Sequence, residues 1–443
     1  MAFKVIYGFA NAKKDMARRG SSGLPTLADY IVPNSVQMFG ECLSAGEIAV
    51  HIVKDVKTRG DEAVHYYTQL LDGVELDALE VSSKLIDEAI TDVDKSVLEA
   101  LKMAAGRIHS YHKSTIPSDW MSMEKGLGER FVPLERAGVY APGGTACYAS
   151  TVLMTAIPAR VAGVKEIILC TPSIDNVVLA AASVAGVDRV FRVGGAQAIG
   201  AMAYGTDTIP NVDMICGPGN IFVTMAKKFV YGDVGIDGLY GPTETVIIAD
   251  HLANPTYCVA DLLAQAEHDA MATPILITTS QELLENVQLN MDEHLNKLER
   301  RDIASAAVNN NGRIVLVDTL DEAIELANLI APEHLCLLIE DAWDWADKIV
   351  NAGGLFIGES SPEVAGDYIA GPSHVMPTGG TSRYSSALGV RHFLKTMPII
   401  NLNLDTLTKI GKAASAIARS EGLTGHALAM DIRLNNMEEN FSE

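Results

Sequence analysis

The sequence has few of the features that mark secreted, membrane-bound or nucleic-acid-binding proteins. It has only six cysteines in 443 residues, none of them in a C-x-x-C pair, and only 34 lysines and arginines against 56 aspartates and glutamates. No basic run interrupts this balance, and a net charge of -22 repels both the phosphate backbone of nucleic acids and anionic membrane surfaces. We therefore expect no nucleic-acid partner and no membrane partner.

The sequence also lacks an apolar run long enough to cross a membrane. The longest, near Val177 to Val187, falls far short of the roughly 20 residues that span a bilayer. The N-terminus becomes charged at Lys13 and Lys14 before any apolar core of a signal peptide develops. The scattered cysteines are typical of reduced thiols rather than of a disulfide framework: Cys42, Cys147, Cys170, Cys216, Cys258 and Cys336. These features predict a cytoplasmic protein.

What the sequence does have is a globular composition, with 48% hydrophobic and 20% charged residues. Its length suggests two or three domains. Residues 45–71 and 82–113 carry apolar side chains near helical spacing. We therefore predict that residues 1–120 form an N-terminal helical segment that packs on the second of two α/β units. Residues 385–443 are predicted to form a short helical C-terminal extension.

Two series of short apolar runs, each followed by a turn and a helix, predict two incomplete Rossmann-like parallel-sheet domains of the α/β class, at 120–238 and 240–380. The predicted strands are 167–171, 190–193 and 212–216 in the first domain and 245–249, 275–278, 314–317, 335–338 and 355–357 in the second. Ligand sites of open α/β sheets gather at the carboxyl ends of the strands. Polar and glycine-rich residues that follow the strands are therefore the first candidates for function.

Three glycine-rich turns could approach a phosphate closely: Gly143-Gly144, Gly194-Gly195 and Gly217-Pro-Gly-Asn220. Glycine permits close backbone contact, and a helix N-terminus offers free N–H groups to an anion. None of the turns matches the usual dinucleotide fingerprint or a P-loop. They indicate either an atypical dinucleotide site or plain turns.

Polar pairs suggest metal binding and acid/base chemistry. Gln265 and His268 lie three apart on a predicted helix and could reach one metal ion, although a surface histidine explains the pattern as well. Glu333 and His334 begin a buried strand, where they could act as a general base and a water activator or simply start the strand.

Two further pairs lie toward the C-terminus. Asp367 and His374 lie in a long polar loop after the last predicted strand, where they could bind a metal or a substrate. Glu421 and His426 lie in the tail, where solvated side chains are the plainer interpretation.

Taken in order, ten motifs resemble those of the histidinol dehydrogenases, over about residues 35–435. They are Val139-Tyr-Ala-Pro-Gly-Gly144, Ser150-Thr-Val-Leu-Met154, Val193-Gly-Gly-Ala-Gln-Ala198, Gly217-Pro-Gly-Asn220, Gly241-Pro-Thr-Glu244, Asp261-Leu-Leu-Ala-Gln-Ala-Glu-His268, Pro332-Glu-His334, Gly366-Asp-Tyr368, Ser373-His-Val-Met-Pro-Thr378 and Glu421-Gly-Leu-Thr-Gly-His426.

The resemblance implies an enzyme with one zinc ion per subunit that oxidises L-histidinol to L-histidine through the aldehyde, with NAD, as the last step of histidine biosynthesis. Gln265, His268, Asp367 and His426 match the family's zinc ligands, which also contact the substrate. Glu333 and His334 match its acid/base pair. Tyr140, Gln197 and Asn220 match its NAD contacts. Thr243, His334, His374 and Glu421 match its further substrate contacts. The family forms homodimers in which the C-terminal segment reaches the partner's site.

Four positions depart from the family pattern. Thr243 stands where serine is common, Tyr240 where a small residue is frequent, and Ser373 where asparagine is frequent. His112 lacks the glutamine that often follows three residues later. These changes bear on the substrate, not on the reaction type. One alternative is the same chemistry on another small primary alcohol such as a sulfopropanediol, and another is a non-catalytic two-domain ligand-binding protein.

Overall fold

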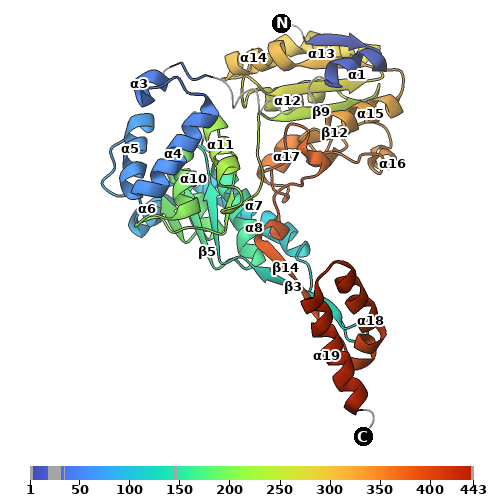
Figure 1. Ribbon diagram of the computed structural model, residues 1–443. Coiled ribbons are helices and arrows are strands. Elements are labelled where there is room, and N and C mark those ends of the chain that lie inside the picture. Colours follow the sequence, from blue (N-terminus) through green and yellow to red (C-terminus); the bar gives the residue numbers. More distant parts are fainter. Residues whose placement is uncertain (1–2, 18–30, 34, 144–146, 441–443) are drawn as a thin grey trace. The chain divides into compact units, whose positions relative to one another are not determined.

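The computed structural model describes residues 3–17, 31–33, 35–143 and 147–440 (Figure 1). The chain divides into two compact units. The first comprises Met1–Ile116 and Leu134–Phe393, and the second comprises Pro117–Pro133 and Leu394–Glu443. Each unit is described below by itself.

The first unit contains a six-stranded sheet in which all strands are parallel. Its order is β1 (Lys4–Tyr7), β11 (Arg313–Leu316), β10 (Thr273–Thr278), β9 (Glu244–Ala249), β12 (His334–Leu338) and β13 (Gly354–Ile357). In the central pair, His334 of β12 lies opposite Thr245 of β9. This register places the residues that precede the two strands side by side.

Helices cover both faces of this sheet. Because both faces of its strands are buried, the strand sequences are nearly continuous apolar runs. One face packs against α12 (Pro255–Ala266), α13 (Gln281–Leu295) and α14 (Arg301–Asn311). The other packs against α1 (Phe9–Ala17), α15 (Leu320–Ile330) and α16 (Ala342–Ala346). Neighbouring residues divide between the faces, as Ile247 and Ile248 of β9 do. The short helix α17 (Glu363–Tyr368) follows β13.

The first unit also contains a five-stranded parallel sheet. Its order is β6 (Arg189–Phe191), β5 (Glu166–Cys170), β4 (Arg136–Tyr140), β7 (Met214–Cys216) and β8 (Gly235–Ile236). One group of contacting helices is α4 (Ala45–Arg59), α5 (Asp61–Asp72), α10 (Gly195–Tyr204) and α11 (Ile221–Val230), and another is α6 (Ser83–Asp92), α7 (Lys95–Ser114), α8 (Ala149–Ala162) and α9 (Asn176–Ala185). The helix α3 (Ser35–Phe39) precedes them.

The α/β class with two parallel sheets and a helical C-terminal extension is confirmed, but one packing prediction is wrong. Within residues 1–120, only β1 and α1 join the six-stranded sheet, while α4 to α7 contact helices of the five-stranded sheet. The reason is the small-residue surface of α10. A Cβ atom added at Gly200 would lie 3.2 Å from Val56 of α4, so the two helices approach closely. An apolar stripe on a helix predicts that the helix packs against a core, but it does not predict which sheet the helix packs on.

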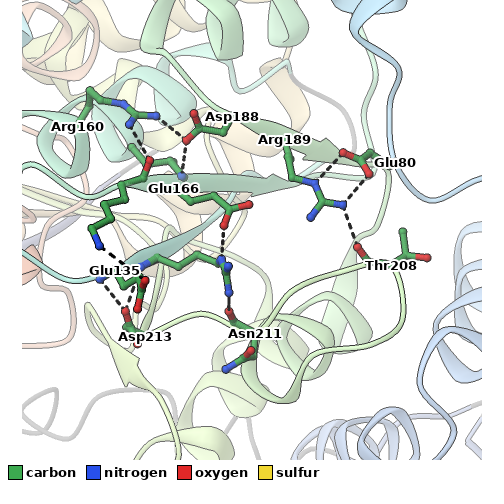
Figure 2. Close-up of polar contacts among 12 residues, drawn as sticks. Glu80, Glu135, Arg160, Glu166, Asp188, Arg189, Thr208, Asn211 and Asp213 are labelled. Carbon is green, nitrogen blue, oxygen red and sulfur yellow. Dashed lines mark hydrogen bonds and ion pairs between the residues drawn. The ribbon is translucent and has the colours of Figure 1, made fainter.

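Charged side chains tie together the amino ends of the five-stranded sheet (Figure 2). Arg136, which begins β4, contacts Glu166, which begins β5, at 2.6 Å. Arg189, which begins β6, binds both carboxylate oxygens of Glu80 at 2.8 and 2.7 Å. Asp213, just before β7, accepts from the backbone N–H of Arg136 at 3.0 Å. Such bidentate and backbone-linked pairs fix the register of neighbouring strands more firmly than isolated surface pairs do.

The second unit consists of a small sheet and two helices. Strand β3 (Leu127–Pro133) pairs antiparallel with β2 (Trp120–Ser122) and β14 (Leu394–Ile400), and α18 (Leu404–Ser420) packs on α19 (Thr424–Asn440). The first α/β domain was predicted to begin at residue 120 and therefore to include β3. The structure instead assigns β3 to the second unit, because β3 pairs with β14, which lies far along the chain. No helix in the described part of the chain is long and apolar enough to span a bilayer.

All six cysteines lie in the described ranges, and all six are free. Cys170, Cys216, Cys258 and Cys336 are buried, whereas Cys42 and Cys147 are exposed.

The burial of His112 on α7 predicts that the stability of the folded chain depends on pH. It is 1% exposed, and neither ring nitrogen has a hydrogen-bond partner among the described residues. Burial lowers the pKa of His112 to about 4. In the unfolded chain the His112 ring has its ordinary pKa near 6.5, so between pH 6.5 and pH 4 the unfolded chain binds a proton that the folded chain does not. The neutral, buried His112 therefore contributes fully to stability above pH 6.5, and this contribution is lost as the pH falls.

We expect His112→Phe to remove this dependence. Between pH 7.5 and pH 5.0 the wild-type free energy of unfolding should fall by about 2 kcal/mol more than that of the variant, measured by urea titration. His109→Phe, at an exposed position of the same helix, is the matched control. Equal pH dependence of His112→Phe and wild type would contradict the prediction.

Candidate active site

A cleft of about 750 Å³ in the first unit is lined by residues from both parallel sheets. The five-stranded sheet presents residues that follow its strands, such as Pro142 after β4 and Asn220 after β7. The six-stranded sheet instead presents residues at the amino ends of its strands, with Thr243 before β9 and Glu333 before β12. The expectation that the site lies at carboxyl ends is therefore right for one sheet and wrong for the other.

Glu333 and Thr243 meet at the amino ends of the paired strands β9 and β12. The Thr243 hydroxyl oxygen lies 2.6 Å from Oε2 of Glu333 and 2.9 Å from Oε1 of Gln265. The backbone N–H of Glu244 donates to the same Oε2 at 3.1 Å. One oxygen of the Glu333 carboxylate is thus held by two donors.

Asp367, on α17, is the centre of the polar contacts in the cleft. Its Oδ2 accepts from Nε2 of Gln265 at 3.2 Å, and its Oδ1 lies 3.2 Å from Nε2 of His334. Its backbone carbonyl oxygen lies 2.7 Å from Nδ1 of His374. The His334 ring also stacks on Phe356 at 5.7 Å between centroids, which fixes its plane.

These contacts set the charge states of the cleft. Burial alone would lower the pKa of His334, but Glu333 and the hydrogen bond to Asp367 raise it well above its ordinary value. Burial alone would raise the pKa of Asp367, but its contact with His334 lowers it. Burial lowers the pKa of His374. The site therefore combines an anionic Asp367 with a histidine whose protonated form two carboxylates stabilise.

The loop that connects Asp367 to His374 is held by helices of the five-stranded half. Arg107 of α7 donates to the carbonyl oxygens of Ile369 and Ala370, at 2.8 and 3.3 Å. The Ser373 hydroxyl donates to the carbonyl of Met154 on α8 at 2.9 Å. His374 Nε2 lies 3.3 Å from the hydroxyl of Thr151, also on α8. The loop thus starts at Asp367 on α17, beside the six-stranded sheet, and is fixed by helices of the five-stranded half.

The opposite wall is built on the Gly217–Asn220 turn. Gly217 has φ +114°, and a Cβ there would lie 2.1 Å from the carbonyl oxygen of Tyr140, so no other residue fits. Asn220 caps α11 by accepting from two backbone N–H groups at 3.1 Å. Behind the turn, the buried pair Lys227 and Asp237 contacts the carbonyl and the N–H of Gly217, at 2.9 and 2.7 Å.

Comparison with known proteins identifies the family. The family model for histidinol dehydrogenase matches residues 43–434. Histidinol dehydrogenase of Dehalococcoides mccartyi strain CBDB1 is 48% identical over 97% of this chain and 100% of its own length. The crystal structure of histidinol dehydrogenase from Elizabethkingia anophelis has a TM-score of 0.89 at 34% identity, covering 98% of this chain and 99% of that chain. This chain belongs to the histidinol dehydrogenase family. It is therefore an oxidoreductase.

Most of the site residues predicted from the family motifs come together in the cleft: Asn220, Thr243, Gln265, His268, Glu333, His334, Asp367 and His374. Tyr140 and Gln197 instead lie behind the wall and are buried. The Tyr140 hydroxyl oxygen accepts from the N–H of Gly195 at 3.1 Å. Both amide atoms of Gln197 lack a hydrogen-bond partner among the described residues. Gly144 lies outside the described residues.

Glu421 and His426 belong to the second unit. Both are exposed, at the end of α18 and the start of α19, and they line a hollow of about 370 Å³ with residues of those helices. Within the described ranges, no three histidine, cysteine or acidic side chains are grouped closely enough to hold a metal ion. The four residues that match the family's zinc ligands are thus divided between the two units.

Sequence reasoning missed Glu363 on α17. This carboxyl group is completely buried, and it accepts hydrogen bonds from the hydroxyl of Thr245 on β9 and from the thiol of Cys336 on β12. Burial raises the pKa of Glu363 to about 7. Its position, four residues before Asp367 on the same helix, was the available signal, since residues at that spacing share a face.

Proposed function

We propose that this chain oxidises L-histidinol to L-histidine, through the aldehyde, with two molecules of NAD and one zinc ion per subunit, as the last step of histidine biosynthesis in the cytoplasm. The observation that carries the proposal is the contact set around Asp367, which joins Gln265, His334 and His374 in one cleft. Membership of the family supports the same reaction.

The donor atoms in the cleft fit a zinc ion. The side chains of Gln265 and Asp367 are in contact, the low pKa of Asp367 keeps it anionic, and His268 lines the same cleft. Zinc accepts such mixed oxygen and nitrogen ligands, and His426 of another subunit would supply the fourth. Gln265 also lies in the last turn of α12, whose C-terminus carries the negative end of the helix dipole. Bound there, zinc would orient an amino alcohol and polarise its oxygen.

The opposite wall fits an anionic cofactor. Helix α11 begins at Ile221, and both Ile221 and Asn220 line the cleft. The N-terminus of a helix attracts phosphate groups such as those of NAD. The unpartnered amide of Gln197 supports a ligand nearby, because a buried polar group without a partner is costly. NAD supplies the hydride acceptor in both oxidation steps.

The side chains of the cleft provide the proton transfers. In its neutral form, His334 is the base that accepts the proton of the substrate hydroxyl, and the carboxylates of Glu333 and Asp367 stabilise the imidazolium that forms. Glu333 then takes a proton from the water that adds to the aldehyde. Retention of the aldehyde in the cleft between the two steps would limit its side reactions. His374 and Glu421 would bind the polar ends of the substrate.

The second unit supports a homodimer whose C-terminal segments complete the partner's site. Its helices and strands expose many large apolar side chains, an unusual cost for a surface that stays in water. They include Trp120, Met123, Met397, Ile400, Leu404, Ile417, Leu428 and Ile432. Glu421 and His426 lie among them, so the same contact that buries these side chains would deliver both residues to a second subunit.

The test is a substrate assay with purified protein, NAD and zinc. We expect two NADH for each histidine formed from histidinol, and growth of a histidinol-dehydrogenase-deficient strain that carries this gene. Turnover of a sulfopropanediol but not of histidinol would favour the alternative substrate. Binding of histidinol without any NADH would favour the non-catalytic binder and would refute the proposal.

A further inference from the structure

Glu363 carries a completely buried carboxyl group that the proposed proton transfers do not use. We propose that Glu363 is a positioning residue for the zinc site, because it anchors α17 and with it the ligand Asp367. In the cleft, Asp367 contacts both Gln265 and His334, so its place decides both contacts. The inference rests on the proposed function, because it takes the cleft to bind zinc. It adds a residue that does not line the cleft and lies outside the ten motifs.

Helix α17 depends on its neighbours for its position. It has only six residues, Glu363–Tyr368, and no side chain caps its N-terminus. A helix of this length is not stable alone, so tertiary contacts must hold it in place. Glu363 begins the helix and Asp367 follows four residues later, on the same face. A contact that holds Glu363 therefore also places Asp367.

Two neighbouring strands of the six-stranded sheet hold the carboxyl group of Glu363. Its Oε1 accepts from the hydroxyl of Thr245 on β9 and, at 3.0 Å, from the thiol of Cys336 on β12. Thr245 lies directly opposite His334 in the sheet, and Cys336 lies two residues beyond His334 on the same face of β12. Glu363 is thus tied to two neighbours of His334, which fixes the separation between Asp367 and the His334 ring.

A second contact holds α17 against the same part of the sheet. A Cβ atom added at Gly366 would lie 2.5 Å from the ring of Phe356 on β13, so the helix packs directly on this ring. The same ring stacks on His334 at 5.7 Å between centroids. The hydrogen bonds of Glu363 and the packing at Gly366 together leave α17 little freedom to slide along the sheet.

Stability alone does not explain a carboxyl group at this position. Glu363 is 0% exposed, and its second oxygen, Oε2, has no hydrogen-bond partner among the described residues. Burial of a carboxyl group is costly, and replacement of both partners of a buried hydrogen bond by apolar groups of the same shape can be neutral or stabilising. In contrast, side chains that orient metal ligands typically contribute about 10- to 100-fold to metal affinity. The benefit of Glu363 therefore lies in zinc binding.

The experiment measures the zinc affinity of the zinc-free, full-length protein in competition with a chelator of known affinity. The decisive variant combines Thr245→Val with Glu363→Leu, which removes both polar partners and keeps their approximate shapes. We expect it to bind zinc about 10- to 100-fold more weakly than the wild type. Its thermal unfolding without zinc should occur at no lower temperature than that of the wild type, because the donor and its acceptor are removed together.

Single variants separate position from charge. Glu363→Gln keeps an oxygen that can accept from Thr245 and Cys336, so it should restore most of the zinc affinity. Glu363→Leu alone should bind zinc as weakly as the double variant does, because Thr245 acts only through Glu363. Glu340→Leu, at an exposed position that follows β12, is the matched control and should bind zinc as the wild type does.

Three results would overturn the inference. One is wild-type zinc affinity in the double variant. Another is an equal loss of affinity in Glu363→Gln and Glu363→Leu, which would assign the effect to charge. The third is a fall in the unfolding temperature of the zinc-free double variant that parallels its loss of zinc, which would assign the effect to general stability. If the wild-type protein itself takes up no zinc, the proposed function fails at its metal ion.

Discussion

Glu333→Gln is expected to stop the reaction at the aldehyde. Glutamine keeps an oxygen that can accept from Thr243 and from the backbone of Glu244, so the local structure should survive. It cannot take a proton from water, and loss of a general base costs typically about 10²- to 10⁴-fold in rate. The NADH formed for each histidinol consumed should fall from two toward one, and histidinal should accumulate. Both quantities follow from quenched samples analysed by chromatography.

The control for this experiment is Glu340→Gln. Glu340 follows the same strand, β12, but at its other end, and its side chain is exposed. The control should form two NADH for each histidinol, as we expect of the wild type. An undiminished second oxidation in Glu333→Gln would refute the role of Glu333 as the base, while leaving the role of His334 open to its own test.

Lys227→Met should give the largest loss of stability. Lys227 and Asp237 form an ion pair whose side chains are 2% and 0% exposed, and Lys227 also donates to the carbonyl of Gly217 at 2.9 Å. Methionine fills similar space but leaves the Asp237 carboxylate buried without its counter-charge. Breaking a buried pair in this way costs about 3–5 kcal/mol. Urea unfolding of the holoenzyme and of the variant measures the difference.

Lys228→Met supplies the matched control, because Lys228 is the next residue of α11 and is exposed. Its free energy of unfolding should stay within about 0.5 kcal/mol of the wild-type value. Because the pair also holds the Gly217 turn, Lys227→Met should raise the KM for NAD as well. Equal stability of the two variants would show that the buried pair contributes little.

Most strands of the two parallel sheets were predictable because each is a short run of apolar residues between turns, but β1, β4 and β8 were not predicted. The pairing partners of the edge strands were not predictable either. Strand β1 adds to the six-stranded sheet beside β11, about three hundred residues away, and β3 pairs with β14 across most of the chain. Local sequence carries no information on such partners. The glycine and alanine surface of α10 determines that α4 packs beside the five-stranded sheet, and an apolar stripe on α4 does not reveal this surface.

The candidate site shows the same division. Residue types and spacing singled out Gln265, Glu333 and Asp367, and the structure places all three in one cleft. Spacing could not show that Thr243 contacts Glu333, 90 residues away, because that contact follows from the pairing of β9 with β12. Spacing also could not show that the amino ends of the strands in the six-stranded sheet face the cleft.

The anchoring of the loop between Asp367 and His374 has a thermodynamic consequence. Asp367 serves one wall of the cleft, while Arg107, Thr151 and Met154 hold its loop from the helices of the other wall. We therefore expect a ligand that shifts this loop at one wall to change the free energy of binding at the other. Such coupling is reciprocal, so a cation that tightens the grip on a cofactor is itself held more tightly, by the same factor, when the cofactor is bound.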